Sequence, residues 1–323
     1  MTPSTLITSF ALTVGVLAAA LAAAIAFGGP TTPAQMVSIN EPFKALDFSD
    51  LPALQHFVAK DGASLAYRVY STSVTPANGS VVLVHGSSAS SNSMHILAKA
   101  FAKAGYDAYA LDVRGHGASG VKGQIGYIGQ LEDDLESFAH AVTFKKPATL
   151  AGFSSGGGFV LRFAGSPRQD IFQNYLLLSP FLSQDAPTYR PDSGGWVKVG
   201  IPRLIAISIL NGFGIRAFND LPVTRFALNE EAKAFLTPEY SYSLAQNFRP
   251  LADYEANIRA AMQPVVVLAG TADEAFYTDK LQDTFRKQGK NWTVTLLPGI
   301  GHIPLTLEPS AVNAAVKAVS DMR

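Results

Sequence analysis

The chain has 323 residues, of which 48% are hydrophobic and 15% charged, and its 25 basic and 25 acidic residues give a net charge of zero. This composition suits one large globular domain with an insertion, or two domains, and the lack of a basic stripe argues against nucleic-acid binding. The chain has no cysteine, which excludes a thiol nucleophile, a disulfide framework and a cysteine-ligated metal.

The N-terminus is dominated by an apolar stretch. Residues 6–29 carry no charge, and about 20 apolar residues are enough to cross a bilayer. We predict a membrane anchor over residues 1–29, with the catalytic domain on the extracytoplasmic side, although the charge signal that orients such helices is weak. The alternatives are a signal peptide, whose cleavage would give a secreted or periplasmic protein, and a buried core helix. Residues 30–53 are predicted to be a linker.

From residue 54 onward, short β-type runs alternate with helical patterns. Residues 55–70 predict an opening hairpin with a turn at Asp61-Gly62. Further strands are predicted at residues 80–84, 106–111, 148–152, 175–178, 265–269 and 293–297, and helices at residues 94–105, 128–144 and 278–288 and from residue 309. Strands that alternate with helices predict a mainly parallel sheet covered by helices on both faces.

The predicted strand at 148–152 runs into Gly152-Phe153-Ser154-Ser155-Gly156. This Gly-x-Ser-x-Gly pattern, with a strand before it and an apolar helix after it, is typical of a nucleophile elbow. Glycine tolerates the close backbone approach that so tight a turn requires, and the free N–H groups of the following helix can hold negative charge. We therefore predict that Ser154 is a catalytic nucleophile, and not a residue of a chance glycine-rich loop.

A serine nucleophile of this kind is followed along the chain first by an acid and then by a histidine. Asp273 comes just after the predicted strand at 265–269, at the carboxyl end where the sites of open α/β sheets lie. Its rivals are Glu274 and Asp279, and helix capping is the alternative role for Asp273. His302, on a glycine-flanked loop after the last strand, is predicted to be the general base that Asp273 orients.

Acyl transfer also needs donors for the developing oxyanion. His85-Gly86-Ser87-Ser88 follows the predicted strand at 80–84, and Gly86 lets the chain turn back over the nucleophile. We predict that the backbone N–H groups of Ser87 and Ser155 form the oxyanion hole, while His85 braces the loop.

The remaining histidines are expected to be structural. A glycine-rich turn over residues 112–119 contains His116, and we interpret this turn as structural too. His85, Asp112 and His116 have the residue types of a metal site, but their spacing fits no metal motif. We predict neither a metal nor a cofactor.

Five motifs in this order carry a family resemblance. They are His-Gly-Ser-Ser at 85–88, Asp-x-Arg-Gly-His-Gly at 112–117, Gly-Phe-Ser-Ser-Gly-Gly at 152–157, Gly-x-x-Asp at 270–273 and Gly-His at 301–302. Together they resemble the α/β-hydrolase superfamily, and within it the monoacylglycerol lipase and lysophospholipase group of serine-aminopeptidase-like hydrolases. The resemblance covers about residues 54–323 and implies the α/β-hydrolase fold. The elbow differs from the Gly-Gly-Ser-Trp-Gly of proline iminopeptidases, and a serine at 154 argues against dehalogenases and epoxide hydrolases.

The stretch between residues 178 and 265 is too long for a plain loop. It is rich in aromatic residues and proline, and we predict a mostly helical cap over residues 181–250, with an apolar helix at 201–210. Most of its aromatic residues are expected to form the cap's own core, but such a lid also suits an apolar acyl group. The predicted function is hydrolysis of a small-molecule ester, a lipid among the candidates, through an acyl-Ser154 intermediate. The alternatives are a thioesterase or amidase with the same machinery, and a non-catalytic binding protein.

Overall fold

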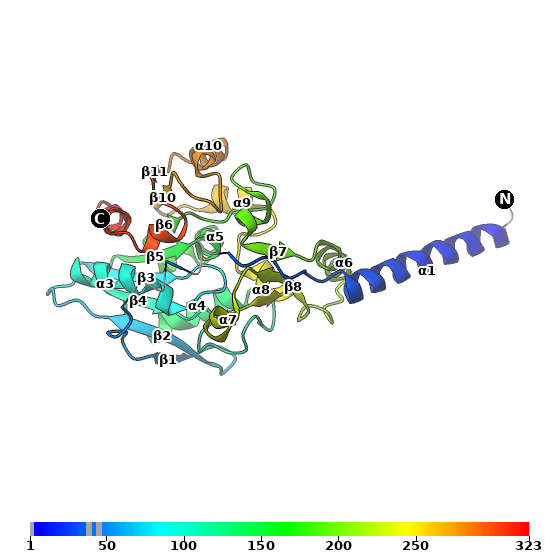
Figure 1. Ribbon diagram of the computed structural model, residues 1–323, viewed down its shortest axis with the longest axis horizontal. Coiled ribbons are helices and arrows are strands. Elements are labelled where there is room, and N and C mark those ends of the chain that lie inside the picture. The colour runs from blue at the N-terminus through cyan, green and yellow to red at the C-terminus, as the bar shows by residue number, and fades with distance from the viewer. Residues whose placement is uncertain (1–2, 37–40, 43–46, 323) are drawn as a thin grey trace.

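The computed structural model describes residues 3–36, 41–42 and 47–322, and an eight-stranded sheet lies at its centre (Figure 1). Its strands are β1 (Gln55–Val58), β2 (Ser64–Tyr70), β3 (Gly79–Val84), β4 (Tyr106–Leu111), β5 (Ala148–Phe153), β6 (Asn174–Leu178), β10 (Val265–Gly270) and β11 (Thr293–Leu297). They lie in the order β1-β2-β4-β3-β5-β6-β10-β11. The pairs β1–β2 and β2–β4 are antiparallel and the other neighbouring pairs are parallel, which confirms the predicted mainly parallel sheet.

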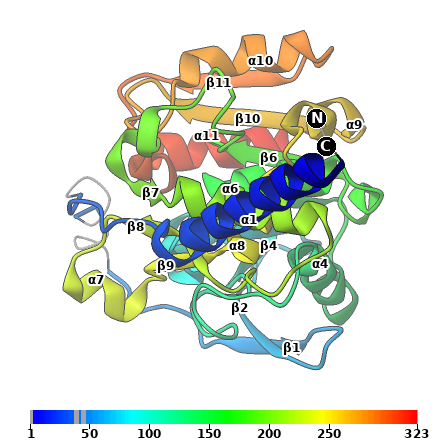
Figure 2. The ribbon, with the colours of Figure 1, turned by 90° about the vertical axis from the view of Figure 1, so that its right-hand side faces the viewer.

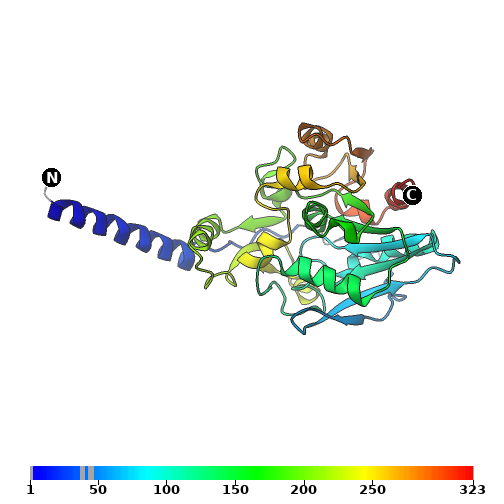
Figure 3. The ribbon, with the colours of Figure 1, turned by 180° about the vertical axis from the view of Figure 1, so that it is seen from behind.

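Helices cover both faces of this sheet, as predicted. They are α3 (His95–Lys103), α4 (Gln130–Ala141), α5 (Ser155–Ala164), α9 (Tyr254–Ala260), α10 (Leu281–Lys287) and α11 (Pro309–Ser320). Helices α3 and α11 pack together on one face, while α4 and α5 lie on the opposite face (Figures 1 and 3). Because both faces are covered, every residue of β3 and β5 is buried, and these strands are continuous apolar runs in the sequence.

Short 3-10 helices join several of these elements. They are η1 (Ser91–Met94), η2 (Gln169–Ile171), η3 (Pro191–Gly195), η4 (Thr278–Lys280) and η5 (Ile303–Thr306). The helix predicted over residues 278–288 is therefore divided into η4 and α10. All the predicted strands of the sheet occur, with ends that differ from the prediction by a residue or less.

The segment between β6 and β10 contains the predicted helices and also a small sheet. Besides η3 and α9, its elements are β7 (Val197–Val199), α6 (Ile201–Gly212), β8 (Pro222–Phe226), α7 (Glu230–Phe235), β9 (Glu239–Ser241) and α8 (Tyr242–Asn247). Strands β7, β8 and β9 form an antiparallel three-stranded sheet that was not predicted, because strands of three to five residues leave no readable alternation. We retain residues 181–250 as the proposed cap.

The N-terminal helix α1 (Pro3–Phe27) projects from the body of the protein, and its C-terminal end lies against α6 (Figures 1 and 2). Residues Thr8–Phe27 of α1 are long and apolar enough to cross a membrane, as either an anchor or a signal sequence would be. Residues 37–40 and 43–46 of the predicted linker lie outside the described residues. The divisions at residues 29 and 53 therefore stay predictions.

Candidate active site

Ser154 stands at the turn between β5 and α5. Its backbone angles are φ 56° and ψ −121°, a conformation that L-residues rarely adopt and that is held only where the surroundings impose it. The turn packs closely on its neighbours, since a Cβ on Gly156 would lie 2.2 Å from the carbonyl oxygen of His85. The sequence thus folds here into the sharp strand-to-helix turn expected from its glycines.

Two loops bring the predicted acid and base to this turn. The Nε2 atom of His302 lies 3.0 Å from Oγ of Ser154, and its Nδ1 atom lies 2.8 Å from Oδ2 of Asp273. All three side chains are buried, with exposed fractions of 6% or less. Asp273 follows β10 and His302 follows β11, so the carboxyl ends of parallel strands assemble this arrangement.

The second carboxylate oxygen of Asp273 accepts hydrogen bonds from the N–H groups of Ala275 and Phe276, at 2.8 and 2.9 Å. Burial raises the pKa of Asp273, but the charge and the hydrogen bond of His302, together with the Phe276 N–H, outweigh it and hold this pKa below its ordinary value. An ionised Asp273 accepts from Nδ1–H of His302. The Nε2 atom is then free to accept the Ser154 hydroxyl proton.

The rival acids take other positions. Oε2 of Glu274 accepts a hydrogen bond of 2.9 Å from the backbone N–H of His302 and so holds the histidine loop without touching the imidazole. Asp279 is exposed and forms an ion pair with Lys280 at 2.8 Å. Asp273 caps no helix, although its Oδ1 atom closes a tight turn in the loop that follows β10.

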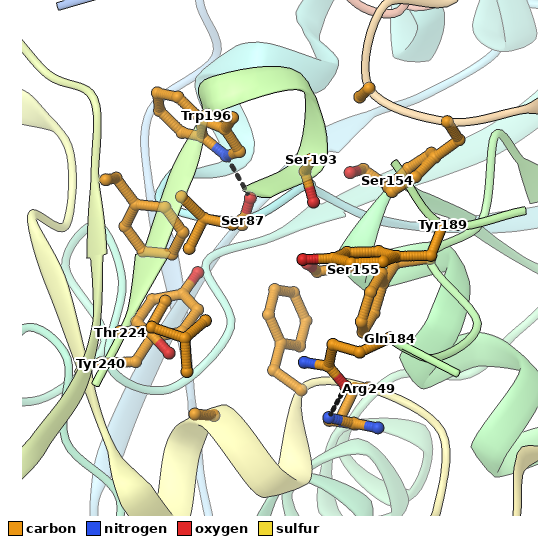
Figure 4. Close-up of a pocket in the computed structure, with 18 of the residues that line it drawn as sticks. Ser87, Ser154, Ser155, Gln184, Tyr189, Ser193, Trp196, Thr224, Tyr240 and Arg249 are labelled. Carbon is orange, nitrogen blue, oxygen red and sulfur yellow. Dashed lines mark hydrogen bonds between the residues drawn. The ribbon is translucent and has the colours of Figure 1, made fainter. Parts of the chain in front are cut away.

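Ser87 and Ser155, whose backbone N–H groups are the predicted oxyanion donors, line the same cavity as Ser154 (Figure 4). Ser155 is the first residue of α5, so its N–H has no acceptor within the helix. Ser87 lies in the loop after β3, and its hydroxyl accepts a hydrogen bond of 2.8 Å from Nε1 of Trp196 (Figure 4). The oxyanion hole itself stays a proposal.

His85 braces this loop in the expected manner. Its Nε2 atom accepts from the Val113 N–H at 3.2 Å, which leaves Nδ1–H to donate to the Gly86 carbonyl at 2.7 Å. Burial lowers the pKa of His85, in agreement with a neutral imidazole that both donates and accepts.

The conceivable metal donors are engaged with the protein. Asp112 accepts from the N–H groups of Ser91 and Ala118, and Nε2 of His116 lies 2.6 Å from the hydroxyl of Tyr240. Within the described part of the chain, no group of three or more histidine, aspartate and glutamate side chains is arranged to hold a metal ion.

Trp196 and Tyr240 belong to the aromatic residues of the predicted cap, and no contact between them and the site was predicted. Both come from the segment between β6 and β10, yet both reach the loop after β3. The Tyr240 hydroxyl accepts the Ser88 N–H at 2.5 Å, as Ser87 accepts from Trp196. These two hydrogen bonds join residues more than 100 positions apart, so no local sequence pattern could indicate them.

Two cavities meet at the reacting atoms. The smaller has a volume of about 80 Å³ and lies against the proposed cap, with Phe181, Tyr189, Phe226, Phe248 and Phe276 among its walls. The larger has a volume of about 810 Å³ and extends toward α7. Both are lined by Ser87, Ser154, Trp196 and His302. A bound molecule can therefore extend to either side of Ser154 at once.

Comparisons with known proteins agree with this architecture. A family model described as serine aminopeptidase, S33, matches residues 75–310. The chain is 34% identical over 113 residues to a monoacylglycerol lipase of Mycolicibacterium smegmatis, and the match spans 33% of this chain and 39% of that protein.

Solved structures share the fold at low identity. A soluble variant of monoglyceride lipase from Saccharomyces cerevisiae, in complex with a substrate analog, is 19% identical, with a TM-score of 0.62, over 84% of this chain and 94% of its own. A membrane phospholipase A, described as a bacterial virulence factor, is 16% identical, with a TM-score of 0.57, over 98% of this chain and 97% of its own.

Proposed function

Because this chain belongs to the serine aminopeptidase (S33) family and has the α/β-hydrolase fold, we propose that it is a serine ester hydrolase. Its substrate is a carboxylic ester with an apolar acyl part, and the reaction passes through an acyl-Ser154 intermediate. The observation that carries this proposal is the buried chain of hydrogen bonds from Ser154 through His302 to Asp273. The relative named as a monoacylglycerol lipase supports an ester in place of a peptide as the substrate.

The proposed reaction follows from the distances in this chain of hydrogen bonds. His302 Nε2 takes the proton of Ser154 Oγ as this oxygen attacks the ester carbonyl. The negative charge of Asp273 stabilises the imidazolium that forms. The imidazolium then gives its proton to the departing alcohol, which leaves the acyl group on Ser154. Water, activated by the same histidine, releases the acid and restores the serine.

The backbone N–H groups of Ser87 and Ser155 are the proposed donors to the tetrahedral oxyanion. The first belongs to the loop braced by His85, and the second opens α5. Preorganised donors of this kind commonly contribute about 10²- to 10³-fold in rate. Neither N–H can be removed by ordinary substitution. The proposal can instead be tested by substitutions that weaken the contacts of the loop that carries Ser87.

The two cavities support a division of the substrate between them. The aromatic walls of the smaller cavity suit the apolar acyl part. The larger cavity is lined by Arg68, Lys122 and Glu231 as well as by apolar groups, and suits the alcohol part. In this arrangement the ester bond lies at Ser154, where both cavities open.

Hydrolysis of 4-nitrophenyl esters from short to long acyl chains tests the proposal, with the full-length protein in detergent. We expect Ser154→Ala to lower turnover by about 10⁴-fold or more. Ser155→Ala is the matched control: it removes the adjacent hydroxyl and keeps the backbone N–H, so turnover should change only a few-fold. The dependence of turnover on acyl chain length would show how long an acyl chain the smaller cavity accepts.

Undiminished turnover by Ser154→Ala would refute the assignment of the nucleophile. If the unaltered protein cleaves no ester but a fluorophosphonate labels Ser154, the substrate is a thioester or an amide. Failure of both hydrolysis and labelling would leave a non-catalytic binding protein.

A further inference from the structure

Large apolar side chains lie exposed on α6 and the loop that follows it. They are Ile201, Ile205, Ile209, Phe213, Ile215 and Phe218, with exposed fractions from 36% to 79%, and together we call them the docking face. Ile201, Ile205 and Ile209 are spaced by four residues and therefore share one side of α6. Single exposed apolar residues are ordinary on protein surfaces, but six of them on one helix and the loop after it indicate a contact with an apolar partner.

The fold does not need these side chains for its own core. Helix α6 packs inward through Ile207, which is fully buried and contacts Val223 and Tyr242. Leu204 of the same helix lines the smaller cavity. Helix α6 thus separates the candidate active site from the docking face.

The end of α1 is fixed to α6. The Arg203 guanidinium donates to the carbonyl oxygens of Ile25 and Ala26, at 2.8 and 3.2 Å, and also to that of Pro222 at 2.9 Å. Gly28 approaches α6 so closely that a Cβ there would lie 2.7 Å from Cβ of Pro202. The apolar helix therefore meets the cap at a packed, hydrogen-bonded junction.

This junction sets the depth of α6 relative to a membrane. The span Thr8–Phe27 has 20 residues, which at 1.5 Å per residue is about 30 Å, the thickness of the hydrocarbon layer. Arg203 binds carbonyls at the very end of that span. Helix α6 consequently lies at the level where α1 leaves the hydrocarbon, at the end of the body from which α1 projects (Figures 1 and 2).

We propose that the docking face rests in the interfacial region of a lipid bilayer while an uncleaved α1 spans that bilayer. Amphipathic helices at this level bury their apolar side about 5–10 Å into the boundary of headgroups and acyl chains. Between Leu204 and Asp220 the only charged residues are Arg216 and Asp220, and an exposed arginine there can extend its charge toward lipid headgroups. The docking does not depend on the proposed activity.

The absence of cysteine from the chain allows a direct test on the full-length protein. Ile205→Cys and Phe213→Cys place a label on the docking face, and Val58→Cys and Met262→Cys are matched controls at exposed apolar positions elsewhere, with exposed fractions of 69% and 76%. Each variant is labelled with an environment-sensitive fluorophore and reconstituted in vesicles of phosphatidylcholine and phosphatidylglycerol. We expect brominated lipid to quench the docking-face labels several-fold more than the controls, and aqueous iodide to do the reverse.

Equal access of iodide to all four positions, with no quenching by brominated lipid, would overturn the proposal. A second copy of the chain is the other possible occupant of this face. It would shield the label at Phe213 from both quenchers and allow a thiol crosslinker to join two chains there, and that result also overturns the proposal. The quenching experiment can also be carried out with Ser154→Ala variants, because it requires no turnover. A failure of the docking proposal can therefore be distinguished from a failure of the proposed function.

Discussion

The two sides of the candidate active site differ in how their residues are buried. On the sheet side, Ser154, Asp273 and His302 are buried and hydrogen-bonded to one another above strands whose core is continuous. On the cap side, some buried residues, such as Phe226 and Phe248, belong to the same core. Ile207, Val223 and Tyr242 form a small cluster of their own, and large apolar side chains on α6 lie exposed. The sheet side therefore holds its geometry through its own contacts.

The two sides are joined by apolar packing, as where Phe248 lies against His85 and Phe159, and by hydrogen bonds. Trp196 and Tyr240 of the cap bind the loop that carries the proposed oxyanion donor, and Arg203 binds the end of α1. Changes on the sheet side should therefore affect the chemistry directly, whereas changes in the cap should act through the loop or through local stability. The following predictions test that difference.

The largest expected effect is on the sheet side. Asp273→Asn cannot supply the negative charge that stabilises the imidazolium, and it favours the wrong tautomer of His302, so we expect kcat to fall by about 10⁴-fold. Glu274→Gln is the matched control. Its side-chain oxygen can still accept the His302 N–H, and turnover should fall less than about ten-fold, the equivalent of roughly 1.4 kcal/mol.

Ester hydrolysis by the two purified variants, measured at one pH with the same substrate, decides between the carboxylates. If Glu274→Gln proved the more damaging change, the acid of the proposed mechanism would be misassigned.

Matched core substitutions compare the stability of the two sides. Leu176 and Ile207 are both fully buried, in β6 and in α6 respectively. We expect Leu176→Ala to lower the free energy of unfolding by about 4–5 kcal/mol, because the sheet cannot close around the cavity, and Ile207→Ala to lower it by about 2–3 kcal/mol, because the small cap cluster can relax.

The chain has two tryptophans, one on each side, which allows separate readouts. Trp292→Phe leaves Trp196 as a reporter of the cap, and Trp196→Phe leaves Trp292, which packs against Phe285 near β11, as a reporter of the sheet side. Denaturant unfolding followed by fluorescence in each background should give an earlier cap transition with Ile207→Ala. Coincident transitions in both backgrounds would mean that the cap and the sheet unfold as one unit.

The difference between the two sides also explains which parts of the fold and of the candidate site could be predicted from the sequence. The strands β3 and β5, the turn at Ser154 and the positions of Asp273 and His302 are encoded by local patterns: apolar runs, glycines and the ends of strands. These were predicted, and the structure brings the three residues together. Their catalytic roles stay a proposal.

The cap was predicted far less completely. Its small sheet, the bond from Trp196 to Ser87 and the junction of Arg203 with α1 depend on residues that are distant in the chain. Glu274 was considered only as a rival acid, and its hydrogen bond to the His302 backbone emerges only when the loops after β10 and β11 are placed side by side. Such contacts are set by tertiary packing, which a single sequence does not display.

A smaller effect concerns acid stability. The pKa of Asp273 is lowered in the folded protein, by His302 in particular and against the effect of burial. Its ionised form therefore stabilises the native state above the unfolded pKa of about 3.9, and that contribution is lost as the pH falls through the lower folded pKa. The difference in unfolding free energy between the unaltered protein and Asp273→Asn should be constant above about pH 5 and shrink below about pH 4. A difference that grew on acidification would show that burial, and not the pairing with His302, controls this group.

The smallest expected effect lies where the two sides meet. Trp196→Phe removes the Nε1–H donor to Ser87 Oγ, while an aromatic ring can still stack on Phe226, which lies 5.2 Å away between ring centroids. A hydrogen bond of this kind contributes about 1 kcal/mol. Its loss should leave the loop that carries Ser87 less firmly positioned and so lower kcat about five-fold. The KM of short-chain esters should change little. Ser87→Ala removes the acceptor from the same bond, and the double variant should be no slower than either single variant. Additive losses would show instead that Trp196 acts on the substrate through the cavity wall and does not position the loop.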